Sequence, residues 1–520
     1  MDAAIAQLVE QMSALRADAE RRDATLRADA ERRDAAAVAR DAALRAEVAA
    51  LRPVALDESP SAPSYAVVGS EALLVLEKAC RISVAVEPSS GTDAVEGAPV
   101  ASPDDLARLR ACATERELVA AITPLLRAAR GFDEAHAAAE ADPCARVLVN
   151  SERVAWLDSL STPLPADQLK KPDLFATWTP FWLGSADPAR GAYGRLAARA
   201  LQLDGCTREF YEAKVGVGEL TVSDFGQLVD YHSRVRGPVR GALFNARAFW
   251  LYESVRSHPV GLTKCEWGAR GSRVLLRAFF NAVPEPPLVP LLRHLCRELR
   301  VEFRRVNASG LEPPDGSDER ASAFLGAGGS ARVFCVAAKG STDAPFALKA
   351  STMLSRADLE YEFTTLQRAA NAGAPVVPVV PGSLVFFFNA AGEHGGGGFL
   401  LRDVCTRAVL DTPARCTAAF AALRALHAAG FAHGDARLPN LLTTRAHGAG
   451  AELRWIDLRE AAVVSLASAQ RADARALAAS VLKVAQGGAL SARIELALDN
   501  VPGDGDAAYA ALAAAVWAAY

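Results

Sequence analysis

Four short motifs follow one another in a fixed order near the C-terminal end, and they constrain the fold of this sequence more than any other feature. Residues 324–336 read FLGAGGSARVFCV, a glycine cluster between two apolar runs. Lys349 lies in PFALKAS, where apolar residues alternate as they do in a strand. The segment HGDARLPN contains Asp435, and the run LRWID ends at Asp457. This order predicts a glycine-rich loop, a strand that carries a lysine, and two later loops that carry polar side chains.

The glycine cluster and the lysine both indicate an anion. Three glycines lack β-carbons and would let backbone N–H groups approach phosphate oxygens closely: Gly326, Gly328 and Gly329. A glycine-rich hairpin turn would show the same composition. Lys349 stands among small apolar residues, where burial is costly unless the ammonium group meets an anion. The predicted helix that follows, RADLEYEFTTLQRA, offers Glu362 or Glu360 as its partner.

Together, the motifs LGAGGSARV, FALK, HGDARLPN and IDLR resemble those of the protein-kinase-like superfamily in order and spacing. The resemblance covers residues 321–520. It implies a bilobal protein-kinase-like domain that uses ATP and Mg²⁺ to transfer a phosphoryl group. It also implies that the glycine loop covers the ATP phosphates, and that Lys349, paired to Glu362, contacts the α and β phosphates.

The same resemblance implies roles for the remaining polar residues. Asp435 would accept the proton of the attacking hydroxyl, and Arg437 would stand where the family usually has a lysine near the transferred group. Asn440 and Asp457 would hold Mg²⁺ against the phosphate oxygens. The metal loop reads Asp-Leu-Arg, few residues separate it from the next helical stretch, and no Ala-Pro-Glu follows. These departures favour an atypical kinase-like domain with a short C-terminal lobe.

A second group of polar residues lies in the middle of the chain. Asp173 follows a proline and opens the apolar run LFATW. Glu212 and Lys214 stand two apart in an alternating stretch, so a strand would place them on one face. Gln227 and Tyr231 stand four apart on a predicted helix and share a face of it. A solvated glutamate–lysine pair would give the same ExK pattern.

These segments, KPD, EAK and QLVDY, resemble the PD-(D/E)xK nuclease superfamily, in particular its branch with a Gln-x-x-x-Tyr helix. The resemblance implies a restriction-endonuclease-like α/β domain in which two acids hold Mg²⁺ and a lysine polarises water. The implied catalytic residues are Asp173, Glu212 and Lys214, with Gln227 and Tyr231 in support. An acid on the preceding helix often completes such a site, and the candidates are Glu117 and Glu152.

The distribution of charge gives an independent indication of a partner. The chain carries a net charge of −4, yet residues 195–305 contain 18 Lys and Arg against 11 Asp and Glu. Four arginines follow the predicted glutamine helix: Arg234, Arg236, Arg240 and Arg247. A basic face favours contact with the phosphate backbone of DNA or RNA. Solvated surface arginines would give the same count.

Residues 1–52 form a separate block without glycine or proline, in which LRADAERRDA occurs twice. Alanine, arginine and glutamate favour helix, and the 11-residue period gives the apolar stripe a right-handed drift. We expect a coiled-coil helix that assembles a homo-oligomer. A single solvated helix or a low-complexity spacer would fit the same sequence.

Length and local composition set the expected domain map. A chain of 520 residues predicts roughly two to four domains at about 150 residues each. Two segments rich in proline and small polar residues, 53–64 and 307–320, are predicted linkers. We therefore expect a multidomain α+β protein with a helical header (1–52), a nuclease-like domain (65–306) and a kinase-like domain (321–520).

The sequence also bears on the compartment. The nine cysteines are scattered without a CxxC pair, which favours a reducing compartment over a disulfide scaffold. The N-terminus lacks the apolar core of a signal peptide, and no apolar run approaches the roughly 20 residues that cross a bilayer. We expect an intracellular protein of the cytoplasm or nucleus, without a membrane partner. A nuclease-like domain followed by a kinase-like domain resembles Crinkler-type effector-like proteins, which implies action on nucleic acid and nuclear entry.

The sequence leaves three functional hypotheses open. The first is an ATP-dependent phosphotransferase, acting on a hydroxyl of a protein or a small molecule, that is fused to a Mg²⁺-dependent nuclease. The second is a metal-dependent nuclease that is regulated by a pseudokinase domain able only to bind nucleotide. The third is a scaffold in which both sites are inactive.

Overall fold

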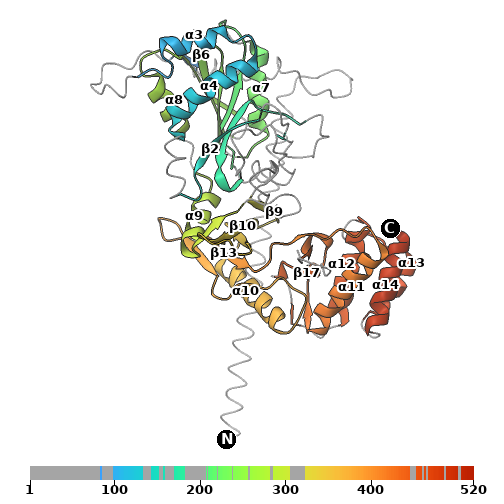
Figure 1. Cartoon of the computed structure of the whole chain (residues 1–520). Helices are drawn as coiled ribbons and strands as arrows, with labels where there is room; N and C mark the ends of the chain where they lie inside the picture. Colours follow the sequence, from blue (N-terminus) through green and yellow to red (C-terminus); the bar gives the residue numbers. More distant parts are fainter. Residues whose placement is uncertain are drawn as a thin grey trace, which may run out of the picture. The chain divides into compact units, whose positions relative to one another are not determined.

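Figure 1 shows the computed structural model of the chain. The chain divides into Met1–Pro63 and Ser64–Tyr520, and every described residue belongs to the second unit. The predicted coiled-coil header and both predicted linkers therefore lie outside the described residues. The structure describes residues 82–84, 98–132, 142–151, 156–157, 169–181, 206–207, 209–218, 221–236, 238–255, 258–281, 285–304, 323–444, 452–458, 462–463, 467–484, 488–501 and 505–520.

The middle part of the chain is built on a seven-stranded mixed sheet. Its strand order is β1-β7-β6-β5-β4-β3-β2, with β1–β7 and β4–β5 parallel and the other pairs antiparallel. The strands are β1 (Ile82–Val84), β2 (Arg146–Asn150), β3 (Leu174–Trp178), β4 (Glu209–Ala213), β5 (Pro238–Phe244), β6 (Ala248–Val255) and β7 (His258–Glu266). Every residue of β3 and β4 is buried, as expected of strands covered on both faces.

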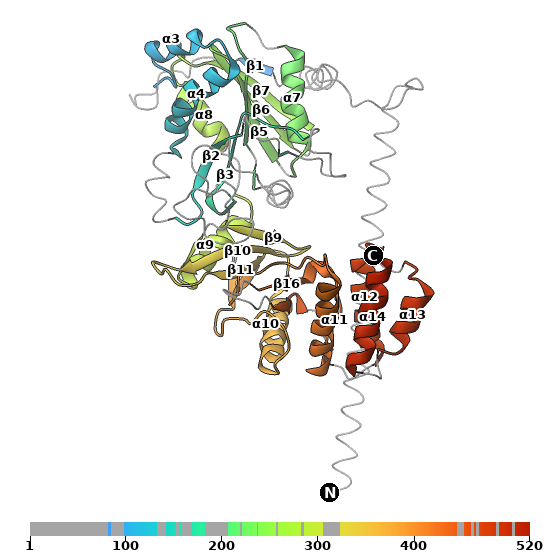
Figure 2. The ribbon, with the colours of Figure 1, turned by 45° about the vertical axis from the view of Figure 1, so that its right-hand side comes forward.

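Helices cover both faces of this sheet, as Figure 2 shows. Three helices pack on one face: α3 (Pro103–Ala111), α4 (Glu115–Arg130) and α8 (Ser272–Asn281). Helix α7 (Val222–Ser233) packs on the other face. In β4, Tyr211 joins the core beneath α4 and α8, whereas the adjacent Phe210 joins the core beneath α7. Successive strand side chains point to opposite faces, so one strand supplies both cores.

Several helix starts are encoded by local sequence. In a capping box, a Ser or Thr side chain accepts from the backbone N–H three residues on, and an acid there bonds back. Such boxes begin α3 at Ser102, α4 at Thr114, α7 at Thr221 and α10 (Arg356–Asn371) at Ser355. Each satisfies backbone donors that the helix itself leaves unpaired.

The C-terminal part begins with a six-stranded sheet of order β12-β13-β11-β10-β8, in which β9 also pairs with β10. Its strands are β8 (Val301–Phe303), β9 (Phe324–Ala327), β10 (Arg332–Ala338), β11 (Phe346–Ser351), β12 (Val385–Phe388) and β13 (His394–Leu401). Strand β8 pairs with β10 although it precedes the predicted linker. The predicted boundary at residue 306 therefore does not coincide with the start of this sheet, because strand pairing crosses the linker.

Helices also cover both faces of the six-stranded sheet. Helix α9 (Leu288–Glu298) contacts β8, β11, β12 and β13, and α10 packs against the opposite face of β13. Glycines in β13 permit the close approach of α9. A β-carbon on Gly398 would lie 2.5 Å from the backbone oxygen of Lys349 and 2.8 Å from Cδ1 of Leu295. Packing therefore explains this glycine of the HGGGG run.

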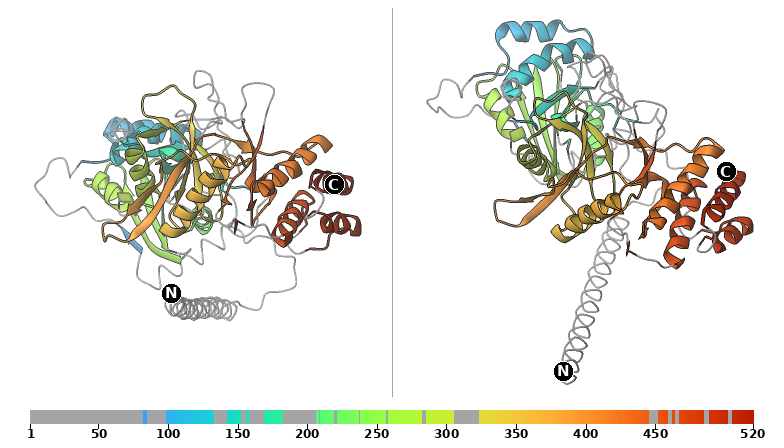
Figure 3. Two further views of the ribbon diagram at one scale, coloured as in Figure 1. Left: turned by 90° about the horizontal axis from the view of Figure 1, so that it is seen from below. Right: turned by 60° about the horizontal axis from the view of Figure 1, so that its bottom comes forward.

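A group of helices completes the chain: α11 (Pro413–Ala428), α12 (Ala467–Val481), α13 (Ala492–Asp499) and α14 (Gly505–Ala519). Figure 3 shows them in orange to red beyond the sheet. Strands β14 (Thr406–Arg407), β16 (Leu441–Thr443) and β17 (Leu453–Trp455) form a three-stranded sheet, and β15 (Phe431–Ala432) pairs with β18 (Ala462–Val463). The described chain is thus a mixed arrangement of helices and sheets, as expected. Within its described part, no helix is both long and apolar enough to span a membrane.

Candidate functional site

A buried lysine on β11 is held by two carboxylates from different elements. The Nζ atom of Lys349 contacts Oε1 of Glu362, which lies fully buried on α10. The same Nζ lies 2.9 Å from Oδ1 of Asp457, which follows β17. The sequence left Glu360 open as the alternative partner, but its side chain is exposed and pairs with an arginine of its own helix. Three segments that are far apart in the sequence therefore meet at one ammonium group.

The two carboxylates preserve the charge of this lysine. Burial lowers the pKa of the Lys349 ammonium, but Glu362 and Asp457 outweigh it, and the net shift is upward. The Lys349 side chain is 10% exposed and that of Asp457 is 30% exposed. Of the two groups, Asp457 is therefore the more exposed to solvent.

The backbone at Asp457 is held in the left-handed region, with φ at 64°. That region costs a non-glycine residue about 1–2 kcal/mol, so neighbouring contacts must maintain it. The backbone N–H of Ile456 donates to the Asn440 carbonyl at 3.0 Å, and Leu458 is fully buried on the other side. Backbone strain of this kind clusters at functional positions. The Asp457 carboxylate contacts Lys349, and the backbone of the preceding Ile456 contacts the loop of Asn440.

The loop between β15 and β16 carries three predicted site residues. The amide nitrogen of Asn440 donates to the backbone oxygen of Asp435 at 2.9 Å and to its Oδ2 at 3.0 Å. Nη2 of Arg437 donates to the same Oδ2 at 2.7 Å. The carboxylate is thus fixed by one neutral and one cationic donor. The Arg437 side chain is 49% exposed, so it has room to turn toward another anion.

Sequence reasoning missed Asp473, an acid that organises this loop. It lies on α12, is 3% exposed, and accepts backbone N–H groups of His433 at 2.5 Å and Gly434 at 2.9 Å. Gly434 has φ at 82°, a left-handed conformation that glycine adopts readily. A signal was present in the sequence, because Asp473 falls on the same helical stripe as the buried Leu477. An acid on a buried stripe indicates a specific partner.

The glycine loop joins β9 to β10. A β-carbon added to Gly326 or Gly329 would meet nothing within 4 Å. Neither glycine has a positive φ, so no strain of the fold explains its presence. Gly328 differs, since its N–H is used within the loop and donates to the Ala331 carbonyl at 2.9 Å. Gly326 lies within β9 and pairs with Val333 of β10, whereas Gly328 and Gly329 are exposed between the two strands.

The predicted Mg²⁺ ligands of this region fit a hard cation. Both contacts of the Asn440 side chain with Asp435 use its amide nitrogen, so they do not involve the amide oxygen. The Asp457 carboxylate lies on the adjoining segment and is partly exposed. Carboxylate and amide oxygens are suitable Mg²⁺ ligands, and Mg²⁺ typically takes its remaining ligands from water and substrate phosphates. No cluster of three or more His, Cys, Asp or Glu able to hold a metal occurs in the ranges that the structure describes.

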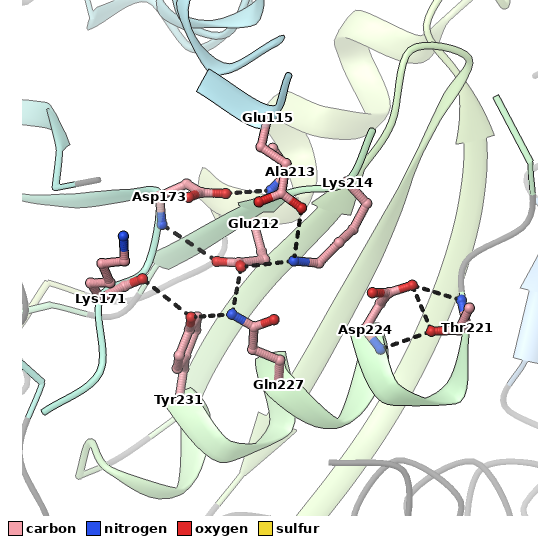
Figure 4. A network of polar contacts seen from close by, with 10 residues as sticks. All are labelled: Glu115, Lys171, Asp173, Glu212, Ala213, Lys214, Thr221, Asp224, Gln227 and Tyr231. Atoms are coloured by element: carbon pink, nitrogen blue, oxygen red, sulfur yellow. Dashed lines mark hydrogen bonds and ion pairs between the residues drawn. The ribbon is translucent and has the colours of Figure 1, made fainter. Parts of the chain in front are cut away.

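The middle part of the chain brings its predicted polar residues together, as Figure 4 shows. Oε1 of Glu212, on β4, accepts from Lys214 Nζ at 3.1 Å and from Gln227 Nε2 at 2.6 Å. Gln227 Nε2 also lies 2.6 Å from the Tyr231 hydroxyl, which donates to the Lys171 carbonyl at 3.2 Å. Helix α7 therefore braces the acid of β4 and the segment that leads into β3.

Asp173 lies at the start of β3, next to the same acid. Its Oδ2 accepts the backbone N–H of Ala213 at 2.7 Å, and its own N–H points to Oε2 of Glu212 at 3.4 Å. Burial and the Glu212 charge raise the pKa of Asp173 to about 8. Burial also raises the pKa of Glu212, although Lys214 opposes the shift. Burial therefore makes the ionised forms of both acids costly.

The acid of α4 that contacts Lys214 is Glu115, and the predicted candidate Glu117 has another role. Oε2 of Glu117 accepts the backbone N–H of Ala113 at 2.7 Å, within the capping box that starts α4. Glu115, two residues earlier, reaches Lys214 Nζ with Oε1 at 3.5 Å. Glu117 is the third residue of α4, and in a capping box the side chain at that position bonds back to the start of its own helix. The other candidate, Glu152, lies outside the described residues.

The predicted basic face is largely neutralised where the structure describes it. Three of its four arginines pair with acids: Arg234 with Asp230 at 3.1 Å, Arg240 with Glu253 at 2.6 Å, and Arg247 with Glu266 at 2.8 Å. Strand neighbours and helical spacing supply these partners, which a count of charges does not reveal. Arg236 is exposed. The excess of arginine therefore does not translate into an open patch on these elements.

Comparisons with known proteins give no match at the level of sequence: no family model and no curated protein matches the chain. Solved structures do align. The kinase domain of PknI from Mycobacterium tuberculosis, in a double-mutant form, covers 38% of this chain and 94% of its own, at 17% identity and a TM-score of 0.26. WaaP in complex with acyl carrier protein covers 38% of this chain and 88% of its own, at 16% identity and a TM-score of 0.25. These alignments are too distant to indicate an activity.

Proposed function

We propose that the C-terminal part of the chain transfers the γ-phosphoryl group of ATP to a hydroxyl acceptor in a Mg²⁺-dependent reaction. The observation that carries this proposal is the position of Lys349 between Glu362 and Asp457. A purely structural ion pair needs only one buried carboxylate. The second acid is partly exposed and directly follows Ile456, whose N–H donates to the Asn440 carbonyl. A metal–phosphate complex bound there would complete the charge balance.

Each side chain has a physical task in the proposed reaction. Bound Mg²⁺ would neutralise phosphate charge, and Asn440 and Asp457 are the residues that would hold it. Lys349 would neutralise the α and β phosphates. The Asp435 carboxylate would accept the proton of the attacking hydroxyl, while Arg437 would turn from Asp435 to the transferred group. Phosphoryl transfer depends mainly on positioning and charge neutralisation, so these residue types suffice.

The proposed acceptor is a hydroxyl of a small molecule or of an unstructured protein segment. A substrate that must dock on a long loop of the enzyme is not expected. Helix α12 begins at Ala467, so only residues 458–466 separate it from Asp457. That segment is too short for an extended activation loop. The proposed enzyme is therefore an atypical kinase-like domain with a short C-terminal lobe.

The experiment is a phosphotransfer assay on the full chain with Mg²⁺, labelled ATP, and a panel of proteins and small hydroxyl compounds. We expect Asp435→Asn to reduce turnover at least about 100-fold, the usual contribution of a general base. Asp411→Asn is the matched control, because Asp411 is an exposed acid paired with a surface arginine. Turnover that survives Asp435→Asn would exclude the proposal. Nucleotide binding without turnover in the wild type would favour the pseudokinase hypothesis.

We also propose a second activity, Mg²⁺-dependent cleavage of DNA or RNA by the middle part of the chain. The specific support is the pair of buried acids, Asp173 and Glu212, next to Lys214. Two carboxylates would hold the cation, and the lysine ammonium would orient a water molecule. The order of the two proposed sites agrees with the Crinkler-type resemblance, in which a nuclease-like domain precedes a kinase-like domain.

Plasmid nicking and RNA cleavage with Mg²⁺ test the second activity. We expect Glu212→Gln to abolish cleavage, because it removes a metal-binding charge while keeping the shape of the side chain. Glu266→Gln is the control, since Glu266 is a half-exposed acid outside the cluster. Nicking that persists in Glu212→Gln would assign the cleavage to a contaminant. If neither activity is found in the wild type, the inactive scaffold is the remaining hypothesis.

A further inference from the structure

A buried chain of hydrogen bonds links the C-terminal helix α14 to the loop that carries Asp435. The Tyr509 hydroxyl on α14 lies 2.5 Å from Nδ1 of His427 on α11. Nε2 of His427 lies 3.0 Å from Oδ2 of Asp473 on α12. Asp473 accepts the backbone N–H groups of the loop at His433 and Gly434. Side chains of three helices, each at most 6% exposed, thus form one hydrogen-bonded chain that ends at this loop.

Each group in this chain has a defined hydrogen-bonding role. The Asp473 carboxylate only accepts hydrogen bonds, so Nε2 of His427 donates to it, and Nδ1 of the neutral ring then accepts from the Tyr509 hydroxyl. A neutral histidine that accepts at Nδ1 carries its proton on Nε2. That proton is donated to Asp473. The Tyr509 hydroxyl therefore favours the tautomer in which His427 donates to Asp473, the acid that accepts the backbone N–H groups of the loop.

Packing does not require this hydroxyl. The Tyr509 ring belongs to the same core as Leu512 and Val516, and a phenylalanine ring would fill that space. A buried hydroxyl is costly unless it is hydrogen-bonded, so an apolar ring would be the simpler choice for stability alone. The polar atom is accounted for by the link it makes to His427.

We propose that Tyr509 is a positioning residue for phosphoryl transfer, which acts through His427 and Asp473 on the backbone next to Asp435. This inference rests on the proposed phosphotransferase function. His433 makes the connection direct, because its Nδ1 accepts the Asp435 backbone N–H at 3.2 Å. Loosening the chain would let Asp435 shift. It would leave Lys349 in place, because that residue belongs to β11.

The test compares Tyr509→Phe with Tyr520→Phe in the full chain. Both remove one oxygen from the last part of the sequence, but Tyr520 is 60% exposed. We expect Tyr509→Phe to lower kcat about fivefold, the effect of one lost neutral hydrogen bond of about 1 kcal/mol. The KM for ATP should stay unchanged. Amide hydrogen exchange at residues 433–435 should become faster, and Tyr520→Phe should alter none of these values.

A double variant and the exchange measurement make the test decisive. His427→Gln breaks the same chain, so Tyr509→Phe combined with His427→Gln should lose no more turnover than His427→Gln alone. Unchanged exchange at residues 433–435 in Tyr509→Phe would overturn the inference, as would additive losses in the double variant. If the wild type shows no phosphotransfer, the proposed function fails, whereas the exchange data still decide whether Tyr509 orders the loop.

Discussion

Lys349, Glu362 and Glu212 are charged side chains in an interior that disfavours charge. Each is accommodated by a specific partner, and in each case the partner comes from another element of the fold. Removing one member of a buried pair leaves the other unpaired, which costs more than the pair itself contributes. At the residue scale, the candidate sites are therefore recognised by buried charges that need a partner from another element to be stable.

Lys349→Met should reduce the free energy of unfolding by about 3 kcal/mol, because Glu362 becomes a buried charge without its ammonium partner. Adding Glu362→Leu should recover much of that loss, while phosphotransfer stays absent. Urea unfolding and the labelled-ATP assay measure the two effects. Lys339→Met, at an exposed lysine, is the control. Recovery of turnover together with stability would contradict the role assigned to Lys349.

The acid pair of the middle part should make stability depend on pH. Burial and Glu212 raise the pKa of Asp173 from 3.8 to about 8, so the folded state binds a proton more tightly than the unfolded chain. Stability should therefore fall as the pH rises from about 4 to about 8. Asp173→Asn should flatten that part of the profile, and Mg²⁺ should stabilise the wild type more at pH 8 than at pH 5. Parallel thermal-unfolding profiles for the two proteins would contradict this prediction.

At the scale of elements, short local signals decide where helices start and how closely strands approach their covering helices. The capping box at Thr114 starts α4 and so places Glu115 next to Lys214. The glycine at position 398 lets α9 lie against β11, the strand of Lys349. Both signals lie outside the sites, yet each sets the position of a site residue.

Gly398→Ala should destabilise the protein by about 1–3 kcal/mol, the usual cost of an added methyl group in a close-packed contact. The new β-carbon would lie 2.5 Å from the backbone oxygen of Lys349, which cannot move aside as a side chain can. Gly329→Ala is the control, because a β-carbon there meets nothing within 4 Å. Thermal unfolding measures both variants. Equal melting temperatures would show that β11 and α9 adjust without cost.

At the scale of the whole molecule, the two largest sheets of the described chain have seven and six strands, and the six-stranded sheet does not begin where composition changes. Strand β8 is part of the six-stranded sheet and helix α9 packs against that sheet, although both precede the predicted linker. The three leucines of α9 at positions 291, 292 and 295 are fully buried. The C-terminal part therefore depends on residues before position 307 for part of its core.

A chain that starts at residue 285 should fold more stably than one that starts at residue 307. The shorter chain loses β8 and the buried leucines of α9, each of which contributes about 1.5–3 kcal/mol through burial. We expect the shorter chain to melt at a clearly lower temperature or to aggregate. Circular dichroism during heating measures the difference. Equal melting temperatures would support the original boundary at residue 306.

Local patterns predicted the strand around Lys349, the helix of Gln227 and Tyr231, and the alternation that places Glu212 beside Lys214. These predictions depend on periodicity and on spacing, which short segments carry by themselves. The sequence named Glu117 as the candidate acid of the preceding helix, with Glu152 as the alternative, but Glu117 bonds back to the start of α4 and Glu115 is the acid that contacts Lys214. A capping acid and a site acid look alike in a sequence. The count of arginines also did not reveal their acidic partners, which lie on the same helix or on neighbouring strands.

The sequence by itself determined which segments form strands and helices and which residue types are available for phosphate and metal chemistry, because backbone preference and side-chain chemistry are local properties. The tertiary structure decided which acid meets which cation, and it revealed the contacts of Asp473 and Tyr509 with His427. Those contacts join residues that lie tens of positions apart, and only the packing of α11, α12 and α14 brings them within hydrogen-bonding distance.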